Sequence, residues 1–189
     1  MIKKLLKSIN QKGYIFTLKK IINFLYYFFR KYYYRILLYL RFLFYKTKYE
    51  ITQNWFLNSE LRIYAKDYIS KSEKNCILEI GSYEGMSAIF FSNNYLLHSE
   101  STLTCVDPHG ESKNIPKEVK GRFIRNIAKS KNFEKVNYLN MESDDFFTSN
   151  TKNFNFIYID GNHEYGQVFR DLTNASKNIT EDGIIWLDD

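Results

Sequence analysis

Residues 76–97, CILEIGSYEGMSAIFFSNNYLL, decide how the rest of the chain is interpreted. A short apolar run leads into a turn that contains Gly81 and Gly85, and a largely apolar helical pattern follows at once. This order is typical of a buried parallel strand whose carboxyl end opens into a helix. The two glycines let the backbone approach a ligand closely, and the amino end of a helix favours a negative group. A plain tight turn is the alternative explanation.

The alternation of strand and helix continues from here to the end of the sequence. Further strands are predicted at 102–107, 136–140, 154–160 and 183–189, with helices at 122–130, near 143–147 and at 164–179. Strands that alternate with helices predict an α/β fold with a doubly wound parallel sheet. An amphipathic helix is also expected at 55–69, ahead of the first strand. We therefore predict one domain at 51–189, preceded by a separate segment at 1–50.

The segment at 1–50 differs in charge from everything that follows. Residues 1–49 carry 12 basic and no acidic side chains, whereas the other 15 basic and all 21 acidic residues lie at or beyond Glu50, which gives that part −6. A uniform nucleic-acid-binding surface is therefore not predicted. Residues 17–48 form a helical pattern with basic side chains on about half of the helix and apolar and aromatic ones on the other. We expect this helix to lie on an anionic membrane surface, with packing against the domain or a partner helix as the alternative.

Neither secretion nor membrane insertion is predicted. The first apolar run, residues 21–29, is too short to span a bilayer, which takes about 20 residues, and no small-residue cleavage site follows it. Cys76 and Cys105 each lie inside a strand-like run without a metal-ligand spacing, so we expect buried, reduced thiols. These features predict a cytoplasmic protein, peripheral on the inner face of a membrane.

Asp107 ends the second predicted strand, 26 residues after Gly81. An acidic residue at this position can accept hydrogen bonds from both ribose hydroxyls of an adenosine-type ligand. Because Pro108 follows, an Asp-Pro turn explains the residue equally well. The dinucleotide pattern G-x-G-x-x-G would need glycines where the sequence has Tyr83 and Met86, so a nicotinamide or flavin dinucleotide is disfavoured.

The stretch YIDGNHEYGQVFRD at 158–171 places Asp160 and His163 where another strand ends. Asp188 and Asp189 end the last predicted strand, and carboxyl ends of neighbouring parallel strands meet at one edge of a sheet. Three carboxylates suit a hard cation, Mg²⁺ first. His163 would be the general base that takes a hydroxyl proton. A turn with incidental charges is the alternative.

Together these motifs resemble the class I S-adenosylmethionine-dependent methyltransferases, over about residues 55–189. EIGSYEG matches the family's cofactor loop and LTCVD its acidic strand end, while IDGNHEYGQVFRDL with EDGIIWLDD resembles a branch often found in O-methylation of glycans and natural products. The resemblance implies a Rossmann-like sheet of strand order 3-2-1-4-5. It also implies that Asp107 holds the ribose, that Glu142 and Ser143 lie near the adenine, and that the methionine part is lined by Glu79, Gly81, Ser82 and Gly85.

We therefore expect an S-adenosylmethionine-dependent methyltransferase, assisted by Mg²⁺, that acts on a hydroxyl of a sugar or another small polar acceptor and not on nucleic acid. A non-catalytic, membrane-associated nucleotide-binding module is the first alternative, and a nicotinamide-dependent reductase is a weaker one. The family's fold adds a helix and an antiparallel strand pair after the fifth strand, but the sequence stops at Asp189. We accordingly expect a fragment that lacks the C-terminal strands, with a naturally shortened domain as the alternative.

Overall fold

The computed structural model of the protein describes residues 14–109, 116 and 118–188. The predictions for residues 1–13 and for Asp189 lie outside the described residues. The chain divides into two parts, residues 1–44 and residues 45–189.

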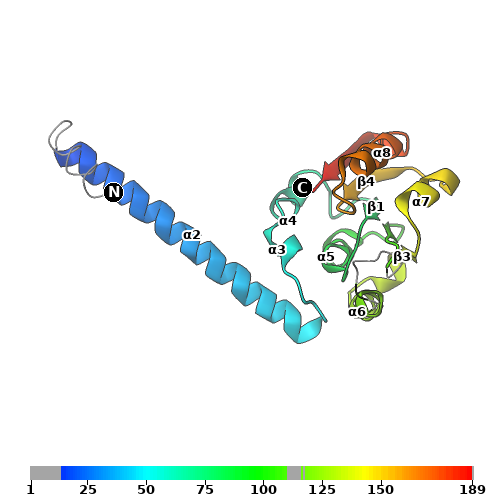
Figure 1. The fold of residues 1–189 in the computed structure, drawn as a ribbon, viewed down its shortest axis with the longest axis horizontal. Helices are drawn as coiled ribbons and strands as arrows, with labels where there is room; N and C mark the ends of the chain where they lie inside the picture. The colour runs from blue at the N-terminus through cyan, green and yellow to red at the C-terminus, as the bar shows by residue number, and fades with distance from the viewer. Residues whose placement is uncertain (1–13, 110–115, 117, 189) are drawn as a thin grey trace. The chain divides into compact units, whose positions relative to one another are not determined.

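The helix predicted at 17–48 is confirmed as α2, Tyr14–Lys48 (Figure 1). Neither glycine nor proline interrupts its sequence, so nothing in it breaks the backbone hydrogen-bond pattern. None of the helices in the described ranges combines the length and apolarity that crossing a membrane requires. Many large apolar side chains of α2 are exposed, among them Leu18, Ile22, Phe24, Leu25, Phe28, Phe29, Ile36, Leu40, Leu43 and Phe44.

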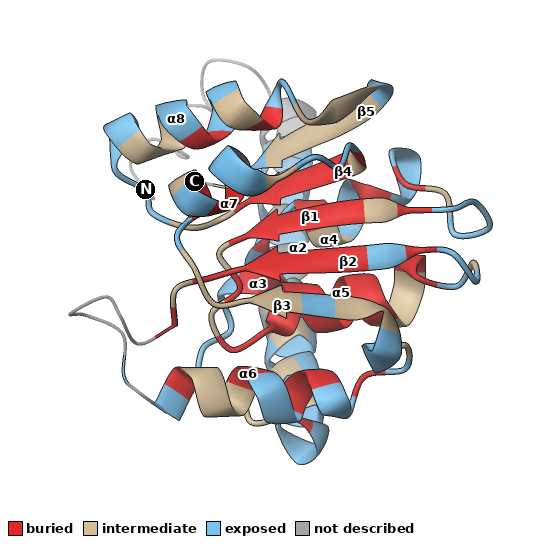
Figure 2. Cartoon of the chain, turned by 90° about the vertical axis from the view of Figure 1, so that its right-hand side faces the viewer, coloured by how far each residue is buried: buried red, intermediate tan, exposed pale blue. Residues whose placement is uncertain are grey.

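Residues 45–189 contain a parallel sheet of five strands in the order β3-β2-β1-β4-β5, which confirms the predicted fold class. The strands are β1 Cys76–Ile80, β2 Thr102–Val106, β3 Val136–Leu139, β4 Phe154–Ile159 and β5 Ile179–Leu187. In the register of the sheet, Leu78 of β1 lies opposite Thr104 of β2 and Ile157 of β4. The three central strands are mostly buried (Figure 2), as expected for parallel strands covered on both faces.

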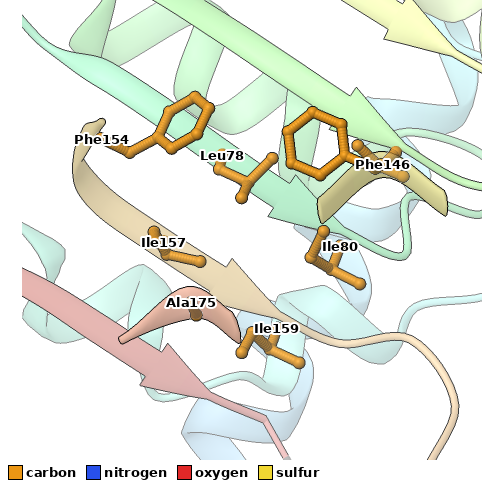
Figure 3. Packing of buried hydrophobic residues seen from close by; sticks show 8 residues of the cluster. Leu78, Ile80, Phe146, Phe154, Ile157, Ile159 and Ala175 are labelled. Carbon is orange, nitrogen blue, oxygen red and sulfur yellow. The ribbon is translucent and has the colours of Figure 1, made fainter. Parts of the chain in front are cut away.

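The helices that follow the strands are α5 Met86–Tyr95, α6 Glu118–Ala128, α7 Ser143–Ser149 and α8 Tyr165–Ala175, with a short 3₁₀ turn, η2, at Phe133–Lys135. On one face of the sheet, α7 and α8 contribute Phe146 and Ala175 to a buried hydrophobic cluster (Figure 3). On the opposite face, α5 contributes Phe91, whose ring packs against Phe156 and Tyr158 of β4. The sheet is thus a middle layer between two sets of helices.

The single helix expected at 55–69 is wrong. The segment contains α3 Trp55–Asn58, α4 Leu61–Tyr64 and a 3₁₀ turn, η1, at Ala65–Asp67. The break falls at Ser59, whose backbone is extended (φ −62°, ψ 137°). Its hydroxyl accepts a hydrogen bond from the Leu61 N–H and donates one to Asp188. A contact 129 residues away in sequence therefore interrupts the helical pattern.

Two other predictions need correction. The predicted helix at 164–179 ends earlier, at Ala175, and the last strand begins at Ile179 and not at 183. The strand is longer because Phe154 of β4 pairs with Ile179 and Phe156 with Ile184, so the extra, partly polar residues of β5 lie in an irregularity of the pairing. Both cysteines are free, but only Cys105 is buried, since Cys76 at the start of β1 is partly exposed.

Candidate active site

A cavity of about 580 Å³ opens at the carboxyl ends of β1, β2 and β4. Parallel α/β sheets bind ligands at this edge. Seven of the residues singled out from the sequence line the cavity together: Gly81, Ser82, Asp107, Glu142, Ser143, Asp160 and His163. Gly81, Asp107 and Asp160, which were assigned to three different strand ends, therefore line one cavity, whereas Asp188 does not.

The loop between β1 and α5 is shaped by two glycines with positive φ, Gly81 at 83° and Gly85 at 85°. A Cβ at Gly81 would lie 2.2 Å from the carbonyl oxygen of Asp160, so this glycine lets the ends of β1 and β4 approach each other. A Cβ at Gly85 would lie 3.0 Å from the ring of Phe123. Gly85 is not among the described lining residues, so its place in the fold is explained by backbone conformation and by packing against α6.

Asp107 lies at the end of β2 and is almost fully buried. Its Oδ2 atom accepts hydrogen bonds from the backbone N–H groups of Ser82 and Tyr83, at 2.7 and 2.9 Å. Its Oδ1 atom is buried and makes no hydrogen bond among the described residues, although His109 Nδ1 lies 3.4 Å from it. A buried carboxylate oxygen without a donor is costly, so this atom is suited to a hydroxyl of a bound ligand.

Glu79 does not line the cavity, which corrects the placement that the sequence suggested. Its side chain is fully buried beneath the loop, where Ser82 Oγ donates a hydrogen bond of 2.5 Å to Oε2. Burial raises the pKa of Glu79 to about 7, the hydrogen bond from Ser82 opposes that shift, and the nearby charge of Asp160 adds to it. Glu79 therefore supports the loop between β1 and α5 from below.

His109 was missed by the sequence analysis. Its imidazole is buried, with Nε2 2.5 Å from the carbonyl oxygen of Tyr83 and Nδ1 2.8 Å from the hydroxyl of Tyr138 on β3. Because a carbonyl can only accept, Nε2 carries the proton in this contact. Tyr83 has a positive φ of 46° without being glycine, so His109 and Asp107 together hold the loop in a conformation that is rare for such a residue. No spacing in the sequence signals this role, since it depends on β2 and β3 being neighbours.

Asp160 and His163 follow β4. The hydroxyl of Tyr158 donates a 2.9 Å hydrogen bond to Asp160 Oδ2, while burial and the charges of Asp160 and Asp188 raise the pKa of Tyr158, which keeps this phenol a donor. The other oxygen, Oδ1, lies 3.9 Å from His163 Nε2. The His163 side chain is 58% exposed. The arrangement can accept a proton on the imidazole and stabilise the resulting charge with a fixed carboxylate.

Asp188 is held near this pair at the end of β5. Its backbone N–H donates to the Ile159 carbonyl, and its Oδ1 atom accepts the 3.0 Å hydrogen bond from Ser59. Across the described ranges, no three side chains of His, Cys, Asp or Glu are arranged to hold a metal ion, and Asp189, the third expected ligand, lies outside those ranges. The three-carboxylate site thus stays a prediction.

Ser143 at the start of α7 and Asp171 of α8 form another part of the wall. The Ser143 hydroxyl donates a 2.6 Å hydrogen bond to Asp171, and the Gln167 amide donates to both. Burial raises the pKa of Asp171, and its two hydrogen bonds counteract that shift. Gln167 and Asp171 were not predicted as site residues, although both lie on α8, the helix that follows His163 directly, and both line the cavity.

The cavity is strongly acidic. None of the described residues that line it is Lys or Arg. Of its carboxylates, Glu84 is neutralised by Arg122 at 2.8 Å. The remaining acidic lining residues are Asp107, Glu142, Asp160, Glu164 and Asp171. Such a wall attracts cationic groups and repels phosphates.

Comparisons with known proteins agree with this geometry. The sequence model of a family described as a methyltransferase domain matches residues 78–189. A comparison with curated proteins found no match.

Solved structures share the fold. A Clostridium thermocellum protein described as an rRNA methylase has a TM-score of 0.54 at 10% identity, over 66% of this chain and 63% of that one. An rRNA methylase from Streptococcus thermophilus has a TM-score of 0.50 at 6% identity, over 67% of this chain and 66% of that one. Cofactor-bound Rv0187 from MTB has a TM-score of 0.50 at 15% identity, over 60% of this chain and 48% of that one. The chain spans about half to two thirds of the length of these proteins, and identities this low establish similarity of fold alone.

Proposed function

This chain belongs to a family of methyltransferase domains, and from that membership we propose that it transfers a methyl group from S-adenosylmethionine to a hydroxyl of a sugar or another small polar compound. The observation that carries the proposal is the acid-lined cavity at the carboxyl ends of the strands, with His163 on its wall. The buried Asp107 Oδ1 atom, which has no donor among the described residues, supports a ligand that brings hydroxyl groups.

S-adenosylmethionine supplies a methyl group on a positively charged sulfur atom. In the proposal, Gly81 and Ser82 face its methionine part, Asp107 binds a ribose hydroxyl through Oδ1, and Glu142 and Ser143 lie near the adenine. The acidic wall favours this ligand because its sulfonium and amino groups outweigh its single carboxylate and leave it with a net positive charge. The same wall would repel the two phosphates of a nicotinamide dinucleotide, which disfavours the reductase alternative.

The chain's own chemistry in this proposal is proton removal. His163 takes the proton of the acceptor hydroxyl on its imidazole, and the fixed carboxylate of Asp160 stabilises the imidazolium that forms. Tyr158 holds Asp160 in place through its hydrogen bond. Replacing His163 with Ala should lower turnover by about 10² to 10⁴-fold, with a smaller loss at high pH, where hydroxide can remove the proton instead.

Metal assistance is a separate part of the proposal. Asp160 and Asp188 offer carboxylate oxygens of the kind that Mg²⁺ binds, and Asp189 would complete the set. If EDTA abolishes turnover and Mg²⁺ restores it, metal assistance is supported. If turnover survives EDTA but is lost in His163→Ala, the centre is metal-free.

The acceptor is proposed to be small and not nucleic acid. Two structures of similar fold are described as rRNA methylases, but residues 50–189 of this chain carry a net charge of −6. That charge and the acidic cavity oppose binding of a polyanion.

We also propose that α2 binds an anionic membrane surface. Support comes from the 12 basic residues without any acidic one at 1–49 and from the exposed aromatic and aliphatic side chains of α2. Two copies of so basic a segment would repel each other, whereas anionic lipid headgroups would neutralise it.

Calorimetric titration with S-adenosylmethionine and, separately, with NADH tests the core of the proposal. We expect binding of S-adenosylmethionine and none of NADH; binding of NADH alone would overturn the assignment. Binding of S-adenosylmethionine without methyl transfer to any hydroxyl compound would favour the non-catalytic nucleotide-binding alternative.

A further inference from the structure

A second cavity, of about 910 Å³, adjoins the first. Its wall consists of Trp55, Asn58, Ser59, Glu60, Asp160, His163, Trp186, Leu187 and Asp188. Three of these residues, Trp55, Asp160 and His163, also line the first cavity. The imidazole proposed to remove a proton therefore stands at the boundary between two cavities, which is where a group would pass from one ligand to another.

Two indole rings and Leu187 form the apolar part of the second cavity. Trp55 is 63% exposed, and its ring lies 5.0 Å from that of Tyr83 in the cofactor loop. Trp186 is half-buried and packs at 5.8 Å against Tyr68. Both rings thus contact a neighbouring aromatic ring and also line the cavity. Aromatic surfaces of this kind bind the apolar faces of ring-shaped ligands.

The polar part of the second cavity is rich in hydrogen-bond acceptors and also includes the Ser59 hydroxyl and the His163 imidazole. Glu60, Asp160 and Asp188 contribute carboxylates, and Asn58 contributes an amide. Two of the carboxylates already accept a hydrogen bond from a neutral hydroxyl, Asp160 from Tyr158 and Asp188 from Ser59. Among the described residues of this wall there is neither Lys nor Arg. Hydroxyl groups can be bound here, whereas an anionic ligand would be repelled.

We infer that the second cavity binds the methyl acceptor and that this acceptor is a ring compound with several hydroxyl groups and no negative charge, such as a neutral glycoside. The role as methyl acceptor rests on the proposed function, but the binding site and its charge preference do not. The aromatic platforms would hold the ring, and the carboxylates and Asn58 would accept hydrogen bonds from its hydroxyls. A phosphorylated or uronic acid sugar would be rejected by Glu60, Asp160 and Asp188.

The chain contains its own probe for this site, because both of its tryptophans line the second cavity. Tryptophan fluorescence of the full chain would be titrated with neutral methyl glycosides of glucose, galactose, mannose and rhamnose, and with the uronates of the first three. We expect at least one neutral glycoside to change the emission, and its uronate to bind at least 10-fold more weakly. Glu60→Gln should reduce the difference in affinity between the neutral glycoside and its uronate, because it removes one negative charge from the wall.

Two variants locate the binding. Trp186 lines only the second cavity, so Trp186→Phe should weaken glycoside binding about 5-fold or more while the calorimetric affinity for S-adenosylmethionine stays unchanged. Phe133→Ala removes an exposed aromatic ring outside both cavities and should change neither affinity. Equal weakening in both variants would overturn the site.

The outcomes separate the inference from the proposed function. If S-adenosylmethionine binds but no neutral glycoside does, or if uronates bind as tightly as neutral glycosides, the inference is wrong and the proposed function stands. If glycosides bind with the expected preference but S-adenosylmethionine does not, the second cavity is a glycoside site and the proposed function fails.

Discussion

One carboxylate oxygen of Asp107 holds the loop after β1, and the other is the one proposed to bind a ligand. Oδ2 holds two backbone N–H groups of the cofactor loop, and Oδ1 is buried with no donor among the described residues. Removing the side chain should therefore disturb the loop and also delete a ligand contact.

Asp107→Ala is expected to weaken S-adenosylmethionine binding by about 2 to 3 kcal/mol, the usual cost of losing a charge-assisted hydrogen bond in a buried place. Isothermal titration calorimetry measures this directly. Asp144→Ala, which removes an exposed carboxylate paired with Arg170 on α8, is the matched control and should leave the affinity unchanged. Equal affinity of a folded Asp107→Ala protein would contradict the assignment.

Glu79 should make stability depend on pH. Its pKa is raised from 4.5 to about 7 by burial, so between these pH values the folded protein keeps a proton that the unfolded chain releases. Stability contributed by this group is then complete below about pH 4.5 and is lost as pH rises to about 7, a change on the order of 3 kcal/mol. Because glutamine cannot ionise, Glu79→Gln should remove this contribution to the pH dependence of the free energy of unfolding.

Urea unfolding of the natural and Glu79→Gln proteins at pH 5 and pH 8 measures the effect. The variant should lose less stability between the two values. Parallel losses in the two proteins would show that Glu79 is already ionised at pH 5.

At the scale of elements, the approach of β1 to β4 depends on Gly81. Gly81→Ala should cost about 3 kcal/mol or more, because the added Cβ would meet backbone atoms of Asp160 at 2.2 Å and alanine disfavours the positive φ. Gly166→Ala on α8 is the control: its Cβ would make only an ordinary contact with Arg170 at 3.7 Å, and the variant should gain up to about 1 kcal/mol. A denaturant midpoint for Gly81→Ala equal to that of the natural protein would refute the packing argument.

The sequence predicts an element well where the signal lies within the element itself, and poorly where the element depends on contacts with distant residues. The strands at β1, β2 and β4 were predicted within one residue at their ends because apolar runs and the glycine turn are local. The break at Ser59 and the early start of β5 were not, because each depends on pairing with a distant part of the chain. In the site, Gly81, Ser82, Asp107, Asp160 and His163 were placed correctly on one cavity. The sequence analysis missed Trp55 on this cavity, Trp186 on the second cavity and His109 against the loop after β1, because only the folded chain brings them to these places.

At the scale of the whole molecule, the separation of charge between residues 1–49 and 50–189 should govern membrane binding. Each basic residue near an anionic surface contributes about 1 kcal/mol, and this attraction weakens with salt. The full chain should float with anionic vesicles at low salt and be released as the salt concentration rises. Neutral vesicles should recover far less of it.

A double variant tests whether α2 causes that binding. Lys19→Glu with Lys20→Glu places two negative charges on exposed positions of α2 and should reduce recovery by anionic vesicles. Lys152→Glu with Lys177→Glu makes the same change of net charge at exposed positions of residues 45–189 and should reduce it less. Equal effects would mean that net charge alone, and not the helix, determines binding.

The close approach of Gly81 to the backbone of Asp160 also determines when the ligand cavity can form during synthesis of the chain. As the chain leaves the ribosome, β1 emerges about 80 residues before β4, its partner in the sheet. Until then the nascent chain has the cofactor loop but not the strand end that closes one side of it. Because β1 pairs with β4 over so long a separation, this pairing can form only after most of residues 45–189 have been synthesised. A nascent chain that ends before residue 163 therefore has no complete ligand cavity, and S-adenosylmethionine cannot stabilise it until β4 has joined the sheet.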